Sequence, residues 1–219
     1  MKAKWIPALG FAVVMAQPGP AHATLTISVA DNGVPVAGCS VTGASPQSAS
    51  CSDANFSSIG VTVQGVPTIP SPDLGTISIS ATAGPLAVTD VLDIVVSQAG
   101  LSNFAGGTGS STFTYNSLIG LAGPVDYSTI FNGSQIATDI LGPALNPQTG
   151  GPFFVNLAPI TGAFTDGQEI AASFGPSLQI QQLEADAQFQ VVGSVVPEPA
   201  SLVLLGSALI MFFGAVRRA

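Results

Sequence analysis

Basic residues are scarce in this 219-residue sequence, which has four Lys and Arg, one His, and twelve Asp and Glu. The basic residues are Lys2, Lys4, Arg217 and Arg218, and the histidine is His22. Residues 24–196 therefore contain no cationic side chain. A body of this kind repels polyanions, so nucleic acid, phosphate and anionic membrane surfaces are excluded as its partners.

The same absence removes most catalytic chemistry. A serine or cysteine nucleophile needs a base such as His or Lys, and residues 24–196 supply neither. Carboxylate chemistry survives, as in glycoside hydrolysis. The candidate pairs are Asp90 with Asp93, Asp166 with Glu169, and Glu184 with Asp186. Sugar sites usually have aromatic walls, but this region holds only Tyr115 and Tyr127 and no Trp. We therefore predict no catalytic residues.

The sequence has only two cysteines, Cys39 and Cys51. They bracket a predicted loop rich in Ser, Gly, Ala and Pro, which is too polar to pack by itself. In an exported chain such a pair predicts one disulfide, which would stabilise the fold by about 3 kcal/mol. A redox thiol is the alternative, but it needs a neighbouring cation to lower its pKa, and none is present.

The N-terminus has the features of a secretory signal peptide over residues 1–23. Lys2 and Lys4 precede an apolar segment at 5–16, and a Pro/Gly break follows. Ala21 and Ala23 then flank His22 as a small-x-small cleavage site. The mature chain is predicted to start at Thr24.

The C-terminus combines an extended motif, an apolar run and a basic end. Pro197 and Pro199 flank Glu198 and block regular helix or sheet there, which leaves the peptide extended and accessible. Residues 202–216 carry no charge, and as a helix they would be about 22 Å long against a hydrocarbon core of about 30 Å. Arg217 and Arg218 would stay on the cytoplasmic side, which places the body outside.

These C-terminal residues resemble the PEP-CTERM sorting signal of exported bacterial proteins. The resemblance rests on Pro197-Glu198-Pro199, the apolar run and Arg217-Arg218, in that order. It implies export by the secretion machinery, transient insertion of the tail in the inner membrane, and removal of the tail by an exosortase. It also implies a destination at the cell surface or in an extracellular matrix, with exopolysaccharide as a partner. An ordinary membrane anchor is the alternative.

The body between the two signals is predicted to be all-β. Leu25, Ile27 and Val29 alternate with polar residues and run into Asp31-Asn32-Gly33, a pattern typical of a strand and a tight hairpin turn. Short strand-like runs follow, and Gly and Pro interrupt every helical pattern. The glycine-rich segments 106–110 and 146–152 are predicted loops, and a break is expected near Gln181-Gln182.

The predicted fold is an antiparallel β-sandwich over residues 24–195, of which a jelly roll is one form. A signal helix (1–23) and an apolar C-terminal helix (within 196–219) would flank it. The sandwich is predicted to bind no cofactor and no metal. Calcium is an open alternative, with Asp31-Asn32, Asp53 with Asn55, and Asp166 with Glu169 as candidate ligands, although such sequences also form plain turns.

The predicted function is that of an exported, exosortase-processed surface or matrix protein with a non-catalytic structural or interaction role. A carbohydrate- or calcium-binding β-sandwich module is the first alternative. A carboxylate-dependent glycosidase is a more distant one.

Overall fold

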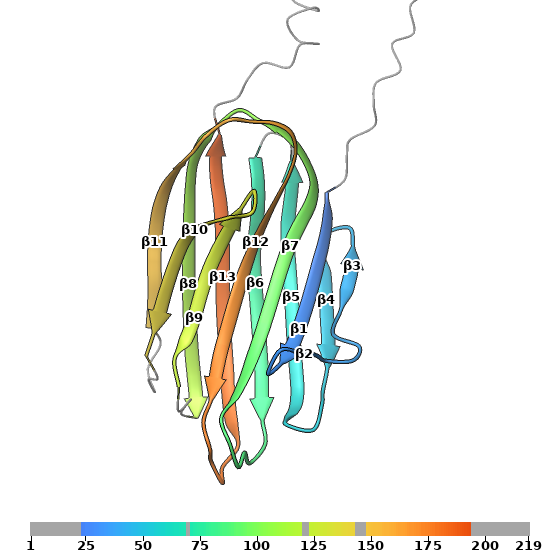
Figure 1. Ribbon diagram of the computed structural model, residues 1–219, viewed down its shortest axis with the longest axis vertical. Coiled ribbons are helices and arrows are strands. Elements are labelled where there is room, and N and C mark those ends of the chain that lie inside the picture. Colours follow the sequence, from blue (N-terminus) through green and yellow to red (C-terminus); the bar gives the residue numbers. More distant parts are fainter. Residues whose placement is uncertain (1–22, 69–70, 120–122, 143–147, 194–219) are drawn as a thin grey trace, which may run out of the picture.

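The computed structural model describes residues 23–68, 71–119, 123–142 and 148–193 (Figure 1). In these residues all regular structure is β, arranged as two stacked antiparallel sheets. The described part contains no helix long and apolar enough to cross a membrane. The predicted signal helix and the predicted apolar C-terminal helix lie outside the described residues, so both stay predictions.

Seven strands form one sheet, in the order β10-β9-β12-β7-β1-β2 with β3 also paired to β1. These strands are β1 (Thr24–Asp31), β2 (Val34–Pro35), β3 (Val41–Gly43), β7 (Asp90–Phe104), β9 (Val125–Phe131), β10 (Ser134–Leu141) and β12 (Ile160–Phe174). Six strands form the other sheet, in the order β11-β8-β13-β6-β5-β4. These are β4 (Gln47–Cys51), β5 (Phe56–Thr68), β6 (Ser71–Ala83), β8 (Gly107–Ile119), β11 (Gln148–Leu157) and β13 (Gln181–Gly193).

The last eight strands wrap as a jelly roll. Their pairing is nested: β9 pairs with β10, β8 with β11, β7 with β12, and β6 with β13, and successive pairs alternate between the two sheets. The predicted antiparallel sandwich is thus confirmed. β1 to β5 extend the two sheets along one side of this roll (Figure 1).

The core lies between the sheets because the strands alternate apolar and polar residues. On β7 the side chains of Leu92, Ile94 and Val96 are buried, and on β13 those of Leu183 and Phe189 are buried. Each fully buried side chain of this size contributes about 1.5–3 kcal/mol of transfer free energy. The alternation leaves the opposite face of each sheet to polar side chains.

Two Asn-Gly turns close hairpins at the ends of β1 and β9. Asn32 and Gly33 have φ angles of 49° and 75°, and Asn132 and Gly133 have the same values. Positive φ at both central residues matches the right-handed twist of the flanking strands. The predicted hairpin at Asp31-Asn32-Gly33 is confirmed, with Asp31 opposite Val34.

The predicted disulfide between Cys39 and Cys51 is present, and the two Cα atoms are 5.5 Å apart. Cys39 lies two residues before β3 of one sheet, and Cys51 is the last residue of β4 in the other. The segment between the cysteines was expected to be a loop, and this prediction was wrong. It forms β3 and β4, because β1 and β5 offer these polar residues backbone partners.

Both glycine-rich loop predictions were also wrong for the described residues. Residues 107–110 belong to β8 and residues 148–152 to β11. Gly109 packs closely there, since a Cβ at this position would lie 3.1 Å from the side chains of Leu157 and Phe189 and would press on both. The break expected near Gln181-Gln182 is found, because β13 begins at Gln181 after an exposed connection.

Candidate functional site

Only one of the three predicted carboxylate pairs shares a surface. Glu184 and Asp186 are both exposed on the outer face of β13. Asp90 is buried at the start of β7, whereas Asp93 lies on the other face of that strand. Asp166 is buried in β12, while Glu169 is exposed on the opposite face. The last two pairs therefore cannot act together on one substrate.

The outer face of the six-stranded sheet carries polar side chains in rows that cross the strands. We call this surface the hydroxyl face. Its longest row crosses all six strands, because the residues that form it are register partners from each strand to the next. The members of this hydroxyl row are Ser48, Thr62, Ser78, Asp186, Thr114 and Thr149.

Hydrogen bonds between side chains link neighbours within the row. Ser78 donates to Asp186 Oδ1 at 2.6 Å, and the hydroxyls of Thr114 and Thr149 are 3.4 Å apart. An ionised carboxylate accepts several hydrogen bonds, so Asp186 can also accept one from a ligand hydroxyl. The row therefore presents donors and acceptors at the spacing of neighbouring strands, about 4.8 Å.

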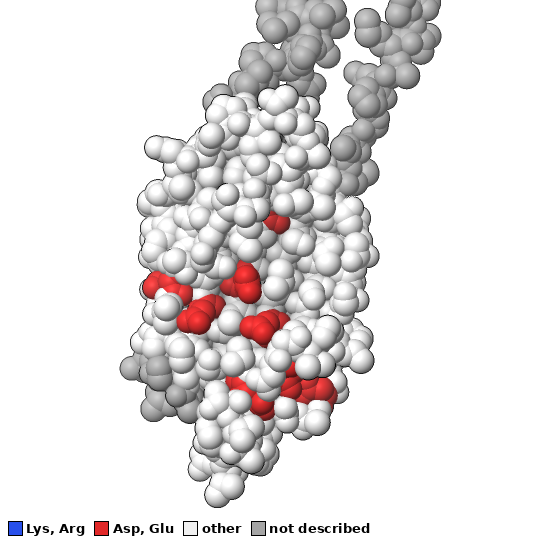
Figure 2. Space-filling view, in the orientation of Figure 1, with Lys and Arg blue, Asp and Glu red and all other residues white. Residues whose placement is uncertain are grey.

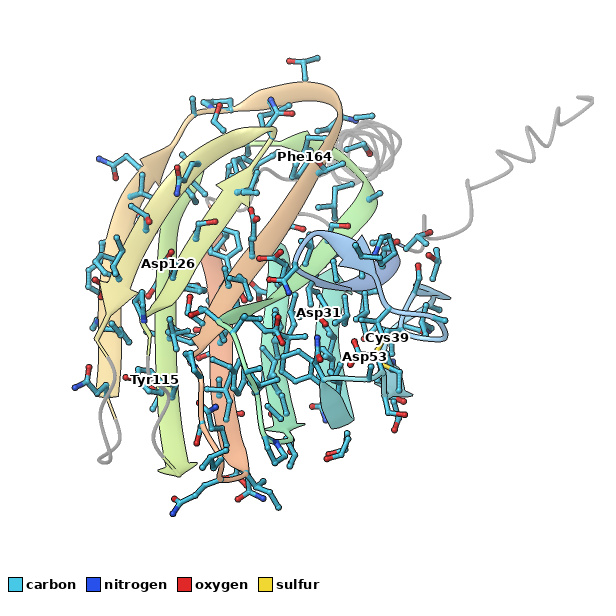
Figure 3. All side chains as sticks on the ribbon, turned by 60° about the horizontal axis from the view of Figure 1, so that its bottom comes forward. Asp31, Cys39, Asp53, Tyr115, Asp126 and Phe164 are labelled. Carbon is cyan, nitrogen blue, oxygen red and sulfur yellow. A yellow bond between two sulfur atoms is a disulfide. The ribbon has the colours of Figure 1, made fainter. Side chains whose placement is uncertain are left out.

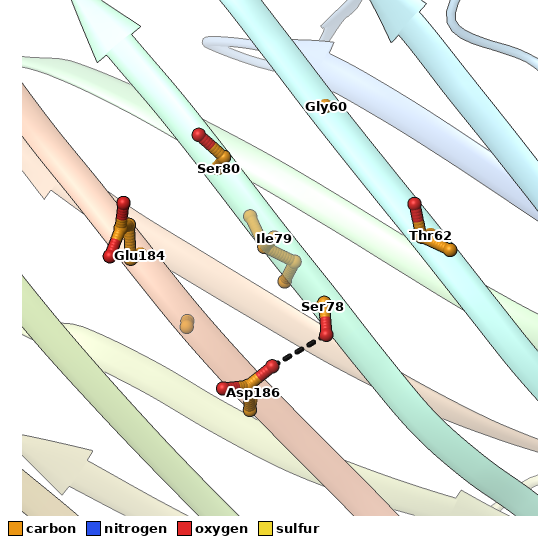
Figure 4. Close-up of a pocket in the computed structure, with 8 residues that line it drawn as sticks. Gly60, Thr62, Ser78, Ile79, Ser80, Glu184 and Asp186 are labelled. Carbon is orange, nitrogen blue, oxygen red and sulfur yellow. Dashed lines mark hydrogen bonds between the residues drawn. The ribbon is translucent and has the colours of Figure 1, made fainter.

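An open groove of about 320 Å³ runs over this face where β5, β6 and β13 meet (Figure 4). Gly60 has no side chain, so the surface dips there between the hydroxyls of neighbouring residues. Glu184 and Asp186 border the groove from β13. Its lining residues are Gly60, Thr62, Ser78, Ile79, Ser80, Glu184, Ala185 and Asp186.

The aromatic residues expected at a sugar site are elsewhere. Tyr115 and Tyr127 are both fully buried in the core, so neither can stack on a ligand. Phe154 is 71 % exposed on β11, opposite Ser110 of the hydroxyl face. Sequence reasoning missed Phe154 because it counted only Tyr and Trp as candidate aromatic surfaces.

The opposite face of the sandwich, on the seven-stranded sheet, is more acidic. Asp93, Asp126 and Glu169 lie on it, and Figure 2 shows carboxylates spread over this side with no basic side chain among them. The outward residues between these acids include Val95 and Ile130, which are half-buried. This surface has the charge that repels polyanions but no comparable hydroxyl row.

Two of the predicted calcium candidates come together beside the disulfide (Figure 3). Asn55 Nδ2 donates to Asp31 Oδ2 at 2.8 Å, and Asp53 Oδ1 accepts the backbone N–H groups of Asn55 and Phe56 at 2.8 Å each. Burial raises the pKa of Asp31, its hydrogen bond with Asn55 lowers it, and the nearby carboxylate of Asp90 raises it further.

This cluster is held by amide donors. Asn32 Nδ2 donates to Asp90 Oδ1, and Asn32 Oδ1 accepts the N–H of Val91. Within the described ranges, no three His, Cys, Asp or Glu side chains are grouped so that they could hold a metal ion. The turn interpretation of these sequences accounts for the hydrogen bonds seen there, whereas Asp31 Oδ1 is buried without a partner in another residue.

The interior contains a second polar region, which the sequence analysis missed. We call it the interior polar cluster; it consists of Gln98, Ser111, Tyr127, Thr129, Asp166 and Gln168, all buried. Ser111 Oγ lies 2.6 Å from Thr129 Oγ1 and also bonds the hydroxyl of Tyr127. Gln168 Nε2 donates to that hydroxyl at 2.6 Å. Burial raises the pKa of Tyr127, so the phenol stays neutral.

The sequence contained one usable signal for this cluster. Gln98 and Gln168 occupy positions that continue the inward-facing phase of their strands, after Val96 on β7 and before Ile170 on β12. A polar residue at an inward position is uncommon unless it is satisfied or functional.

The sorting residues Pro197, Glu198, Pro199, Arg217 and Arg218 lie outside the described residues, as does Ala21 of the cleavage site. Ala23 is described and packs into the core. β1 begins at Thr24, directly after the predicted cleavage point. Export and processing therefore stay predictions from the sequence.

No protein-family model matches the chain, and no curated protein matches it. Among solved structures, it is similar to the CBM36-1 domain of a multidomain xylanase from the hindgut metagenome of Trinervitermes trinervoides. The identity is 14 %, over 69 % of this chain and 99 % of that domain, with a TM-score of 0.26. A likeness at this level supports no inference about function.

Proposed function

We propose that this protein is an exported, non-catalytic β-sandwich that holds a neutral, hydroxyl-rich polysaccharide on its hydroxyl face. One observation carries the proposal: the hydroxyl row crosses six strands without interruption and passes through the groove beside Gly60. A polymer with regularly repeated hydroxyl groups can form several hydrogen bonds with such a row at once. Each hydrogen bond contributes little free energy, so the affinity would come from several bonds formed together.

Charge selects the class of polymer. The body has eleven carboxylates, the twelve of the whole sequence less Glu198, and no cation. An acidic polysaccharide would be repelled, whereas a neutral one has no such penalty. Glu184 and Asp186 then act as hydrogen-bond acceptors for sugar hydroxyls. Phe154 offers an exposed ring near the end of the same face, where a sugar ring can stack.

The arrangement of the acids supports a binding role over hydrolysis. Glycosidases place two carboxyl groups on either side of the scissile bond. Glu184 and Asp186 are instead side by side on one strand of an open surface. A polymer lying over them would meet both from the same side.

The proposed location follows from the two ends of the sequence. The resemblance to the PEP-CTERM signal supports processing by an exosortase and retention at the cell surface or in the matrix. The disulfide is consistent with an oxidising compartment. In this proposal, adhesion to exopolysaccharide through the hydroxyl face keeps the processed protein in the matrix.

Affinity electrophoresis tests the binding proposal. The full-length protein would be run through gels containing a neutral β-glucan, a neutral galactomannan or the polyanion alginate. We expect retardation by at least one neutral polymer and none by alginate. The double variant Glu184→Gln/Asp186→Asn should weaken retardation about tenfold, since carboxylates are stronger acceptors than amides.

A matched variant separates the site from the general effect of charge. Asp126→Asn/Glu169→Gln removes two exposed carboxylates from the opposite sheet, and it should leave retardation unchanged. Equal losses in the two double variants, or no retardation by any neutral polymer, would contradict the proposal.

A further inference from the structure

Part of the interior polar cluster has no hydrogen-bond partner from any other residue. Asp166 is 2 % exposed, and no other residue forms a hydrogen bond with either of its carboxylate oxygens. Gln98 is 0 % exposed, and neither its Nε2 nor its Oε1 has a partner. Gln168 Oε1 is also unpaired. Buried polar atoms are almost always satisfied by protein, water or an ion, so this group of atoms marks a place suited to one of the last two.

Sheet register places these side chains side by side. Asp166 on β12 is the register partner of Gln98 on β7, and Gln168 follows two residues later on the same face. Gly167 lies between them, and a Cβ there would be 2.9 Å from the carbonyl oxygen of Val96. The missing side chain lets β12 approach β7 closely at this point. Gln168 is held in place through its hydrogen bond to Tyr127.

The occupant must neutralise negative charge. A buried carboxylate without a counter-charge costs many kcal/mol, and the body has no Lys, Arg or His to pair with it. Only a proton or a bound cation is left. Burial raises the pKa of Asp166 to about 8 in the absence of a cation, and the charge of Asp73 on β6 adds to this effect. Tyr127 is the other titratable group of the cluster, and it stays neutral.

We propose that Asp166, Gln98 and Gln168 bind a calcium ion between the two sheets. Four oxygens without a partner in another residue are available: both carboxylate oxygens of Asp166 and one amide oxygen from each glutamine. An oxygen-only set selects a hard cation, and the two negative charges of Asp166 and Asp73 match a divalent one. Calcium takes six to eight oxygens, so water or nearby hydroxyls would complete the shell.

A site with so few charged ligands binds weakly. Sites of low charge in extracellular modules have Kd values of about 10⁻⁴–10⁻³ M. Such affinity is sufficient where calcium is abundant, outside the cell. The ion would link β7 and β12 of one sheet through its ligands. The negative charge of Asp73 on β6 would attract it from the facing sheet.

Thermal unfolding of the chelator-treated, full-length protein tests the site. At pH 7.5, 10 mM CaCl₂ should raise the Tm by about 3–8 °C, whereas NaCl of equal ionic strength should not. Asp166→Asn and Gln98→Leu should each abolish most of this shift. Asp31→Asn, which changes the other aspartate cluster, should retain it. Calcium titration calorimetry on the wild type should give one site, with affinity falling steadily as the pH is lowered below 8, because protons compete for Asp166.

A measurement on the wild type alone keeps the proposal falsifiable if the variants do not fold. No heat of binding and no Tm shift would overturn it, and a proton would then be the occupant. A calcium shift of equal size in the wild type and in Asp166→Asn would overturn it as well. Loss of polysaccharide binding would not bear on this site, because the hydroxyl face lies on the outside of the other sheet.

Discussion

Two polar regions of this molecule differ in what their side chains can bond to. On the hydroxyl face, Ser78 and Asp186 bond each other and are exposed, so water can satisfy whatever the protein does not. In the interior polar cluster, Asp166 and Gln98 are shielded from water and find no partner in another residue. An unpaired polar group therefore costs little folding free energy on the surface and several kcal/mol in the interior. Substitutions should change stability in the interior and binding on the surface.

The largest effect expected from this contrast concerns Asp166. Its folded pKa of about 8 lies above its ordinary value of 3.8 because of burial. The folded state therefore keeps a proton that the unfolded chain releases above pH 4. This contribution to stability is fully present below pH 4, falls as the pH rises, and is gone above pH 8. The loss amounts to several kcal/mol, up to about 6.

Asp166→Asn, which does not titrate, isolates this effect. In chelator, the free energy of unfolding of the wild type should fall relative to that of the variant between pH 5 and pH 8, as measured by urea denaturation. The same comparison with Asp186→Asn on the hydroxyl face should be nearly flat. A constant difference between the wild type and Asp166→Asn would mean that Asp166 is not buried as a neutral acid.

The second effect concerns single hydroxyl groups. Tyr127→Phe removes an oxygen that bonds Ser111, Thr129 and Gln168 inside the core. The buried partners left behind should lower the free energy of unfolding by about 1–3 kcal/mol. Ser78→Ala removes a hydroxyl on the surface and should change it by less than about 0.5 kcal/mol. Denaturant unfolding of both variants measures the two losses in free energy of unfolding. Losses of similar size would contradict the proposed difference between the two regions.

The smallest effect has opposite signs for stability and binding. Gly60 lies in the middle of β5, and the nearest atom to a Cβ there is the carbonyl oxygen of Ser80, at 3.8 Å. Gly60→Val should fit and should raise the free energy of unfolding by about 0.5–1 kcal/mol, because glycine weakens a strand. The new side chain would fill the groove and reduce retardation by neutral polysaccharide.

Ser50→Val is the matched control for Gly60→Val. Ser50 is the register partner of Gly60 on the edge strand β4, and it does not line the groove. The same residue introduced there should leave retardation unchanged. If both variants bind like the wild type, the groove is not where the polymer lies.

Local patterns in the sequence predicted much of the fold. The alternation at Leu25, Ile27 and Val29 predicted β1, and the Asn-Gly pair at 32–33 predicted its hairpin. The two cysteines predicted their disulfide, since no other pairing exists in the chain. These predictions succeeded because each depends on near neighbours or on composition.

Predictions that required knowledge of distant neighbours were less successful. The cysteine-flanked segment and the glycine-rich segments were expected to be loops, but strands from elsewhere in the sequence pair with them. The carboxylate pairs were chosen by closeness in sequence, and only Glu184 with Asp186 shares a surface. The residue beside Asp166 on the neighbouring strand proved to be Gln98, and no local pattern places the two together.

The sequence by itself determined that the body is β-structured, carries no cation between residues 24 and 196, and closes one disulfide. Only the tertiary structure decided which polar residues meet. A period of two specifies which face of a strand a side chain occupies, but the strands beside it are chosen by the nested pairing of the jelly roll. That pairing aligns Ser78 with Thr149 across the four strands β6, β13, β8 and β11, and it buries Asp166 beside Gln98. Because both arrangements depend on contacts far apart in the sequence, neither can be found in any short stretch of it.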